Sequence, residues 1–588
     1  MRKITFKKKL FTTLCSLFVG LIFCSAQEMM YEIPLSNQVS NSNQIVEGKV
    51  ISKNSFWDLN HQNIYTVNIV EVYKVFKGQA LTTLQIITEG GVVDMTAQIT
   101  TLSLELAVGD IGVFMLHDSN VRFYDDITFS NKFESYSAIQ GFYKYDLQEN
   151  RVSNPYLSVD GIGDNFYPKV TSQTQSDFIV MSSFDIDNHI RNHSFNRLGG
   201  LVITDFSPSS ITGGTRSILT INGAGFGATM GNVLFRDANS GGSTYFTSLD
   251  SQIISWSDTQ ILVEVPSRAG TGTFRVVNSG GGFNNSGNPV VIPYSEINVT
   301  TSSDIAYPTQ HVDDNGNGGY TWSMNVTFFL NNDANQSFTR AFDTWRCETG
   351  INWDLDPSFT TINTIALDNT NIIRFDNSTE LPAGVLGRNT SYFSGCSGGT
   401  EWYISELDIV FDSGTNWQYG PGAPTSSQID FETVAVHELG HGHQLAHVID
   451  PNAIMHYAVG SGVSNRVLST NDILGGNDVQ DRSTTTPVCF RGLMTDHSCS
   501  LGINESELQN LVSIYPNPAK NEIFIRNDYH VSIDKIEMYD ITGRVVKVSR
   551  LENSNSLHSL NVSELSNGVY LVNIDIEGKV LTKKIVIE

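Results

Sequence analysis

The first third of the chain alternates short apolar runs with polar turns. NQIVEGKVISKNSFW, IYTVNIVEVYKVFKG and TTLQIIT are rich in Val, Ile and Thr and are separated by Asn and Gly. Alternation with a period of two places apolar side chains on one face of a strand, so residues 27–195 are expected to form a β-rich domain. The sequence leaves open whether this region is a binding module or a pro-segment that is removed.

Two later regions show the same strand pattern. Residues 201–293 contain short alternating strands broken by Gly, Pro and Asp turns, and residues 510–588 end the chain with further strands of this kind. Short strands separated by turn residues are typical of a small β-sandwich. We therefore expect an immunoglobulin-like sandwich in the first region and a C-terminal sandwich in the second.

Residues 295–502 differ, because helix and strand patterns alternate there. SMNVTFFLN, TIALDNTNIIRF and ELDIVFD predict strands, and a helix is expected after Asp430, a suitable N-cap. NQSFTRAFDTWRCETG predicts a helix with one apolar face, formed by Phe338, Ala341, Phe342 and Trp345. The fold class is therefore multidomain, with one α+β domain flanked by β domains.

The helix after Asp430 contains VAVHELGHGHQLAH, which holds four of the chain's thirteen histidines. His437 and His441 lie one helical turn apart on one face and can bind one Zn²⁺ at ~2.0–2.1 Å. Glu438 is then placed to polarise a zinc-bound water and take its proton. His447 would lie about 15 Å along the axis from His437 if the helix continued, so it can join them only if the chain turns sharply.

This arrangement resembles the metzincin zinc peptidases, whose motif is H-E-x-x-H-x-x-G-x-x-H. The resemblance implies one catalytic Zn²⁺ held by His437, His441 and His447, with Glu438 as the general base. The glycine of the family motif is Gln444 here. A non-glycine residue with positive φ is expected at this turn, at a cost of about 1 kcal/mol.

The stretch NAIMHYAV supplies a Met-turn of the kind found in the matrixin and astacin branches. The resemblance implies that Met455 forms an apolar floor under the zinc and that Tyr457 assists as an oxyanion donor or weak fifth ligand. A core or pocket-wall role for Tyr457 is the alternative. The resemblance also implies a substrate-binding edge strand near residues 404–412. His443 points away from the metal face and is expected on the surface or behind a ligand.

The two flanking sandwiches resemble known families as well. INGAGFG and SWSDTQILVEVP within residues 201–293 resemble an IPT/TIG domain, which is usually a spacer or adhesion module. YPNP, YDITGR and LSNGVY within residues 510–588 resemble the C-terminal sorting domain of the type IX secretion system. This second resemblance implies export through the outer membrane by the type IX machinery.

The N-terminus also indicates export. Residues 1–26 combine a basic start, an apolar stretch and small residues before Gln27, as in a cleavable signal peptide. No later segment reaches the ~18 apolar residues of a membrane helix, so no transmembrane segment is expected in the mature chain. The net charge of −25 argues against a nucleic-acid partner. The mature protein is expected to be extracellular or on the cell surface.

Four cysteines remain after the signal: Cys347, Cys396, Cys489 and Cys499. An even number in an oxidising compartment suggests two disulfides. Three pairings are open; proximity favours Cys489–Cys499 and elimination then favours Cys347–Cys396. Residues 27–195 contain no cysteine, so the thiolate latch of matrixins cannot operate here.

A Ca²⁺ site is a weaker expectation. DDNGNG, residues 313–318, matches the first half of a calcium-binding loop, but Met324 stands where a bidentate glutamate is required. An Asn/Gly turn is the favoured alternative.

Together these patterns predict a secreted zinc endopeptidase that acts on proteins or peptides. The alternative is an exported adhesin with a structural or inactive zinc site. Structural zinc sites usually close with four protein ligands, whereas three histidines leave an open position for chemistry. Cleavage preference, latency and oligomeric state are not predicted.

Overall fold

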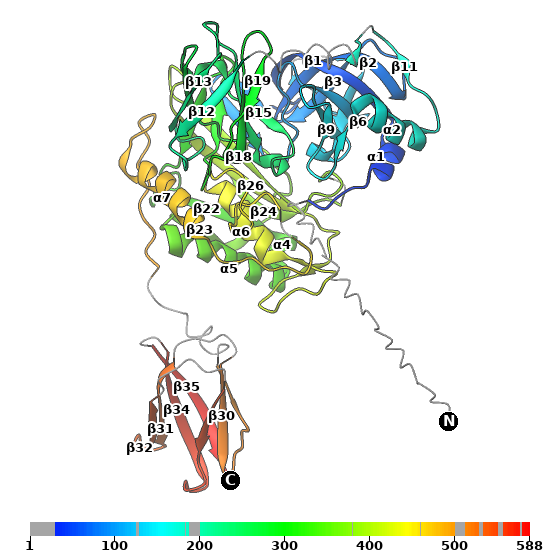
Figure 1. Ribbon diagram of the computed structural model, residues 1–588. Coiled ribbons are helices and arrows are strands. Elements are labelled where there is room, and N and C mark those ends of the chain that lie inside the picture. The colour runs from blue at the N-terminus through cyan, green and yellow to red at the C-terminus, as the bar shows by residue number, and fades with distance from the viewer. Residues whose placement is uncertain are drawn as a thin grey trace, which may run out of the picture. The chain divides into compact units, whose positions relative to one another are not determined.

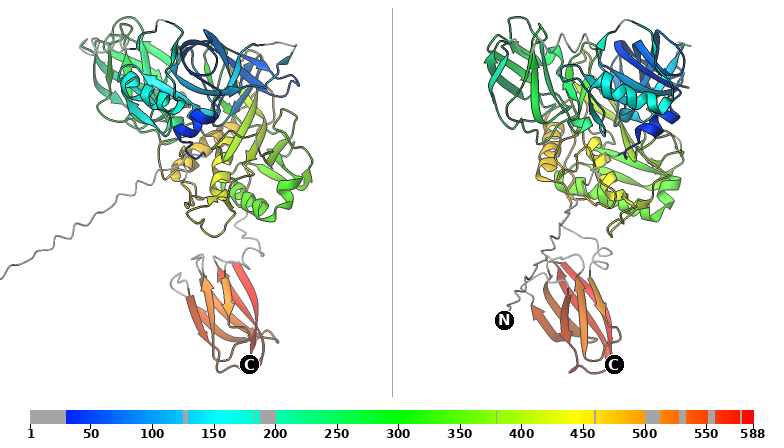
Figure 2. Two further views of the ribbon diagram at one scale, coloured as in Figure 1. Left: turned by 90° about the vertical axis from the view of Figure 1, so that its right-hand side faces the viewer. Right: turned by 45° about the vertical axis from the view of Figure 1, so that its right-hand side comes forward.

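The computed structural model describes most of the chain. The described residues are 30–124, 129–182, 184–186, 200–378, 380–458, 460–499, 512–527, 533–550, 557–576 and 579–588. The predicted signal peptide lies outside them. The chain forms two compact units, Met1–His497 and Ser498–Glu588, and each is described by itself (Figures 1 and 2).

The N-terminal region is a curved sheet that closes on itself. Strand β1 pairs with both β2 and β6, so the order β1-β2-β3-β7-β6 returns to its start. The β-rich prediction is correct. The elements are α1 (Leu35–Asn41), β1 (Gln44–Trp57), β2 (Ile64–Lys77), β3 (Thr83–Glu89), β6 (Ile111–Asp118), β7 (Lys132–Ser135), β8 (Phe142–Asp146), β9 (Arg151–Ser153), β10 (Ser158–Asp160), α2 (Tyr167–Thr174) and β11 (Ile179–Val180).

The second region is the predicted sandwich of two four-stranded sheets, packed around buried Leu219, Phe235 and Phe274. One sheet has the order β12 (Val202–Ser207), β13 (Ile218–Ala224), β17 (Gln260–Glu264), β16 (Ile253–Trp256). The other has the order β15 (Tyr245–Thr247), β14 (Asn232–Asp237), β18 (Ala269–Val277), β19 (Phe283–Asn285). A short 3-10 turn, η4 (Ala238–Ser240), follows β14.

The third region contains a mixed sheet. Its order is β23 (Trp353–Thr360), β22 (Tyr320–Asn325), β24 (Asn371–Phe375), β26 (Trp402–Phe411), β25 (Gly387–Gly395), β5 (Thr96–Thr100), β4 (Gly91–Val93). The pairs from β23 to β26 are parallel and β25 is antiparallel. The predicted edge strand near 404–412 is wrong, because β26 lies inside the sheet. Beyond β25, the sheet continues with strands of the N-terminal region.

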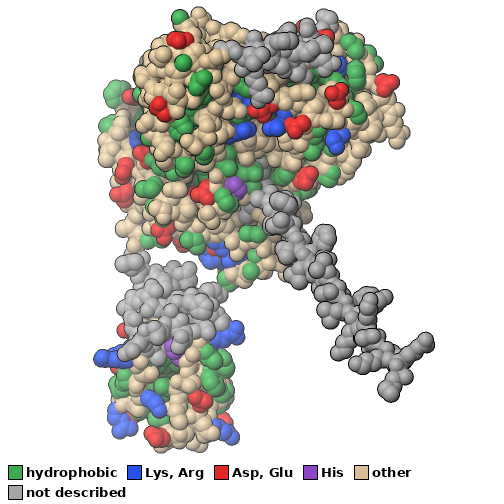
Figure 3. All heavy atoms as spheres, in the orientation of Figure 1, with side chains coloured by type: hydrophobic (Ala, Val, Ile, Leu, Met, Phe, Trp, Pro, Cys, Tyr) green, Lys and Arg blue, Asp and Glu red, His purple; other side chains and the backbone are tan. Residues whose placement is uncertain are grey.

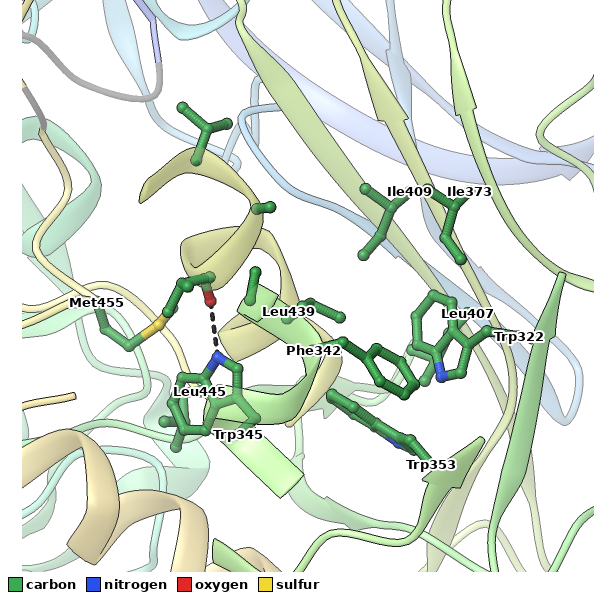
Figure 4. Packing of buried hydrophobic residues seen from close by; sticks show 14 of the residues in the cluster. Trp322, Phe342, Trp345, Trp353, Ile373, Leu407, Ile409, Leu439, Leu445 and Met455 are labelled. Carbon is green, nitrogen blue, oxygen red and sulfur yellow. Dashed lines mark hydrogen bonds between the residues drawn. The ribbon is translucent and has the colours of Figure 1, made fainter. Parts of the chain in front are cut away.

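Four helices accompany this sheet: α4 (Val326–Leu330), α5 (Asn332–Thr349), α6 (Phe431–Gly442) and α7 (Thr470–Thr485). The strand predicted for SMNVTFFLN ends early, because the Asn325 side chain accepts the Thr327 N–H and starts α4. The predicted apolar face of α5 is correct, since all four of its residues are fully buried. Figure 4 shows Trp345 and Phe342 of this face packed with Trp322, Trp353 and Leu439.

Short strands complete the third region: β20 (Asn298–Thr300), β21 (Ala306–Gln310), β27 (Trp417–Gln418) and β28 (Ile429–Asp430). A disulfide joins Cys396, just after β25, to Cys489, after α7, with the Cα atoms 5.1 Å apart. Both predicted cysteine pairs are therefore wrong. The fold brings together cysteines separated by 93 residues, which proximity in the sequence cannot indicate.

The second unit is also a sandwich, as predicted. Its three-stranded sheet has the order β29 (Val512–Tyr515), β30 (Glu522–Asn527), β33 (Leu557–Asn561). Its four-stranded sheet has the order β32 (Val545–Arg550), β31 (Ile533–Asp540), β34 (Gly568–Ile576), β35 (Lys579–Ile587). Buried Ile523, Met538 and Val572 belong to its core.

The helices of the described part of the chain are too short or too polar to cross a membrane. Figure 3 shows Asp and Glu side chains scattered over the face in view.

Candidate metal centre and cleft

Helix α6 begins where its cap residue predicts. Asp430 accepts the Thr433 N–H at 3.1 Å and also pairs with Arg466. The helix ends at Gly442, and Gln444 adopts φ 71°. The sharp turn predicted before His447 is therefore present with a non-glycine residue. The Thr309 hydroxyl donates to the Gln444 side chain at 2.8 Å, and this contact holds the turn.

The turn brings three imidazoles together. The Nε2 atom of His447 lies 3.2 Å from that of His437 and 3.1 Å from that of His441. Each Nδ1 atom has an oxygen partner elsewhere: Ile454 O at 2.8 Å for His437, Leu445 O at 2.8 Å for His441 and Asn239 Oδ1 at 2.9 Å for His447. These three histidines form a cluster that could hold a metal ion.

The donor set fits Zn²⁺. Oxygen partners at Nδ1 place the proton there, so each Nε2 carries a free lone pair toward the centre. Nitrogen atoms bound tetrahedrally to zinc at the usual bond length lie about 3.3 Å apart, close to the spacing found here. Burial lowers the pKa of all three imidazoles, that of His441 to about 4, so they are neutral and able to bind a cation.

Glu438 lies beside this cluster and is fully buried. Its Oε2 atom accepts a hydrogen bond from the Thr101 hydroxyl at 3.3 Å, while Oε1 has no hydrogen-bond partner among the described residues. Burial raises its pKa to about 8, and the Thr101 hydrogen bond and the Arg388 charge oppose that shift. The Oε1 atom of this carboxylate is therefore uncommitted, that is, not engaged in a hydrogen bond with the described residues.

Met455 packs directly under the histidine helix. A Cβ atom added to Gly440 would lie 2.2 Å from its sulfur. The carboxylate of Asp472 accepts the N–H groups of Ile454 and Met455, at 2.8 and 3.1 Å, and so fixes this turn. Figure 4 shows Met455 beside Trp345, whose indole donates to the carbonyl of Val436 at 2.7 Å.

The sandwich region takes part in the site, although it was expected to be a spacer or adhesion module. Asn239 belongs to η4 and contacts His447 across 208 residues of sequence. Tyr457 lies against the same turn, since a Cβ atom added to Gly241 would lie 2.3 Å from the phenol oxygen. No local sequence signal indicates these partners.

The structure also describes the surroundings of His443 and of residues 313–318. His443 is not on the surface: it is fully buried, contacts the Thr349 hydroxyl at 2.9 Å and has a pKa lowered to about 3 by burial. In residues 313–318, Asp313 accepts the N–H of Gly318 and Asn315 accepts those of Asn317 and Gly319. This bonding is that of a polar turn, the favoured alternative to a Ca²⁺ loop.

A cavity of about 310 Å³ adjoins the histidines. Its walls come from all three regions of the first unit and include Thr101, Leu102, Asn239, Arg268, His441 and His447. Arg268 is held by Asp237 at 2.5 Å and by Glu105 at 3.0 Å. The guanidinium in this wall is therefore paired with carboxylates of the protein itself.

Comparisons with known proteins agree with this division of the chain. Residues 201–292 match the IPT/TIG domain family, residues 317–479 match the matrixin family and residues 513–588 match the secretion system C-terminal sorting domain. Among curated proteins, none matches. A solved structure titled "Biofilm associated protein - BSP domain" is 8% identical, covers 92% of this chain and 81% of its own and has a TM-score of 0.16, so no argument rests on it.

The sorting domain indicates type IX export to the cell surface or the extracellular space. The chain carries a matrixin region between an IPT/TIG domain and a C-terminal secretion sorting domain.

Proposed function

We propose that the protein is an exported zinc endopeptidase. The observation that carries this proposal is the convergence of three neutral imidazole Nε2 atoms beside the uncommitted carboxylate oxygen of Glu438. The matrixin match supports a metallopeptidase, and the sorting domain supports action outside the cell.

His437, His441 and His447 would hold the metal. Zinc, when bound, supplies a Lewis acid that acidifies water and polarises a carbonyl. Glu438 accepts the proton of the water that attacks the scissile carbonyl and delivers it to the departing amine as the C–N bond breaks. The burial that raises the pKa of Glu438 makes it a stronger proton acceptor. The Tyr457 phenol would donate a hydrogen bond to the oxyanion, and Met455 supports the histidine helix from below.

The substrate would be an extended peptide. Sheet edges bind peptides by adding them as a further strand. At the end of the sheet nearest Glu438, β25 is the last strand that the matrixin region contributes. Glu438 lies against this strand, because a Cβ atom added to Gly387 would lie 3.3 Å from its Oε1 atom. A peptide on β25 would therefore run past the proposed base.

The test compares casein hydrolysis and zinc content in the wild type and in Glu438→Ala, each after its N-terminal region has been cut. We expect Glu438→Ala to keep its zinc and to lose about 10²–10⁴-fold in rate, and a chelator to stop the wild type. Glu348→Ala, an exposed position on α5, is the matched control and should keep full activity. Equal rates for Glu438→Ala and wild type would refute the assigned base. A zinc-loaded wild type that hydrolyses nothing after its N-terminal region has been cut would favour the adhesin alternative.

A further inference from the structure

The outer edge of β25 is covered by a strand from the N-terminal region. Strand β5 pairs antiparallel with β25, from Thr96 opposite Ser394 to Thr100 opposite Thr390. The pairing continues one residue further, where the Thr101 N–H donates to the Asn389 carbonyl at 2.9 Å. The edge to which a peptide substrate would add is therefore occupied by the protein's own chain.

The same segment reaches the catalytic side chains. The Thr101 hydroxyl accepts the Asn389 N–H at 2.9 Å and donates to Glu438 at 3.3 Å. The next residue, Leu102, is 6% exposed and belongs to the core of the matrixin region. Both residues line the cavity next to His441 and His447. The segment thus fills the place where the reacting bond of a substrate would lie.

The segment turns at this point, whereas an added peptide strand stays extended. Leu102 has φ 59°, and the Ser103 N–H turns back to the Thr100 carbonyl at 3.3 Å. Leucine rarely adopts this left-handed conformation, which persists only where surrounding contacts impose it. The chain begins as a substrate would and then bends away from the path that a cleavable peptide follows.

Ion pairs and hydrogen bonds hold the segment at both ends. Before it, Glu89 pairs with Arg388 of β25, and Asn63 accepts the Tyr392 hydroxyl at 2.8 Å. At the end of the segment, Glu105 pairs with Arg268 of the IPT/TIG domain at 3.0 Å. The segment is therefore anchored to both regions that build the cleft.

We propose that residues 96–106 are a built-in, substrate-like strand that blocks the active site, so the peptidase is latent until this segment is displaced or cut. This proposal rests on the proposed peptidase function. Because residues 27–195 contain no cysteine, the block depends on main-chain pairing and on the Thr101 contact with Glu438.

Displacement would also create a subsite for an acidic side chain. The Arg268 guanidinium pairs with Asp237 through Nη2 and with Glu105 through Nη1. When residues 96–106 leave, the Nη1 atom loses its partner in the wall of the cavity that contains His441 and His447. A Glu or Asp of the substrate is the group that replaces Glu105, since a partly buried guanidinium prefers a carboxylate.

The experiment uses the full mature chain with recognition sites for a site-specific endopeptidase inserted at two exposed turns. One site follows Asp94 and the other follows Val108; Met95 is 44% exposed and Val108 is 59% exposed. We expect cutting at both sites to release the segment and raise hydrolysis of a fluorogenic peptide about tenfold or more, because the open cleft becomes the major state. The released peptide added back should inhibit.

Three controls accompany this experiment. Chains with one inserted site keep the segment tethered and should gain less activity. Glu438→Ala in the double-site chain should abolish the gain, which excludes activity of the added endopeptidase. Ile99→Pro, which places a residue without an N–H in β5, should raise activity without any cut.

The outcomes separate the two proposals. Uncut protein that is as active as cut protein overturns the block and leaves the peptidase intact. Cut protein that has lost the segment by mass spectrometry, binds zinc and hydrolyses nothing overturns the peptidase.

The subsite is tested on the cut protein with two peptides that differ only by Glu or Gln after the cleaved bond. We expect kcat/KM to favour the Glu peptide about tenfold in the wild type and in Arg268→Lys, but not in Arg268→Gln. Zinc content is measured for each variant. Arg268 pairs with Asp237, which lies two residues before Asn239, the hydrogen-bond partner of His447, so a change at Arg268 could disturb the metal site. Equal values for the two peptides in the wild type would overturn the subsite.

Discussion

Single side chains from distant parts of the chain complete the candidate metal centre. His437 and His441 are oriented by main-chain carbonyls close to them in sequence, whereas His447 depends on Asn239 of the IPT/TIG domain. A partner at the second ring nitrogen fixes the tautomer of a ligand histidine and raises its basicity. Asn239 is therefore a positioning residue.

Replacing Asn239 should weaken metal binding. We expect Asn239→Ala to reduce zinc affinity about 10–100-fold, measured by competition with a chelator, because His447 loses its Nδ1 acceptor. Asn239→Asp keeps an acceptor oxygen and should restore most of the affinity. Asn222→Ala, in β13 of the same sandwich, is the control. An unchanged affinity in Asn239→Ala would show that this contact does not support the site.

The sequence predicts those site residues that lie together in one short segment. His437, Glu438, His441 and His447 could be identified because they lie within eleven residues on a helix and its turn. Asn239 could not be identified, because it lies 208 residues from its partner and a hydrogen bond leaves no spacing pattern.

Elements were predictable where local chemistry defines them. Asp430 caps α6, and the apolar spacing of α5 gives its buried face. The order of strands in the sheet was not predictable, because β25 and β26 are both largely buried and only long-range pairing decides which lies outside. The error about the substrate edge has this origin.

Helix α7 is tied to the start of the matrixin region by a buried ion pair that should make stability depend on pH. Glu296 pairs with Arg482, and burial raises its pKa from 4.5 to about 7, although Arg482 opposes the shift. The folded protein therefore favours the protonated form of Glu296. This contribution to the free energy of unfolding is fully present below pH 4.5 and is lost as the pH rises through 7.

Glu296→Gln should remove that dependence. We expect the melting temperature of Glu296→Gln minus that of the wild type to increase by a few degrees as the pH is raised from acidic to slightly alkaline. The reason is that glutamine remains neutral, whereas Glu296 becomes charged. Glu348→Gln provides a control at an exposed position. A difference that stays constant across this range would show that Glu296 remains ionised in the folded protein.

At the scale of the first unit, three regions meet at one cleft. Arg275 of the IPT/TIG domain is fully buried and pairs with Asp146 at 2.9 Å and Glu149 at 2.6 Å in the N-terminal region. Together with Arg268 and Arg388, it fastens the region that carries residues 96–106 to the rest of the first unit, next to Glu438 and the histidine cluster.

Arg275→Met should loosen this region. Removing one member of a buried ion pair costs about 3 kcal/mol or more, since the remaining carboxylates lose their partner. We expect faster hydrogen exchange over residues 142–160 and, if residues 96–106 block the cleft, higher peptidase activity without cutting. Exposed Arg216→Met is the control. Unchanged exchange in Arg275→Met would show that the contact does not fasten the two regions.

The hydrogen bond between Asn239 and His447 joins two regions that match two different families, the IPT/TIG domain and the matrixin region. A recombination event that exchanged the sandwich for an unrelated one would leave the third imidazole without its anchor. An expression fragment that begins after the sandwich would lack the side-chain partner of His447.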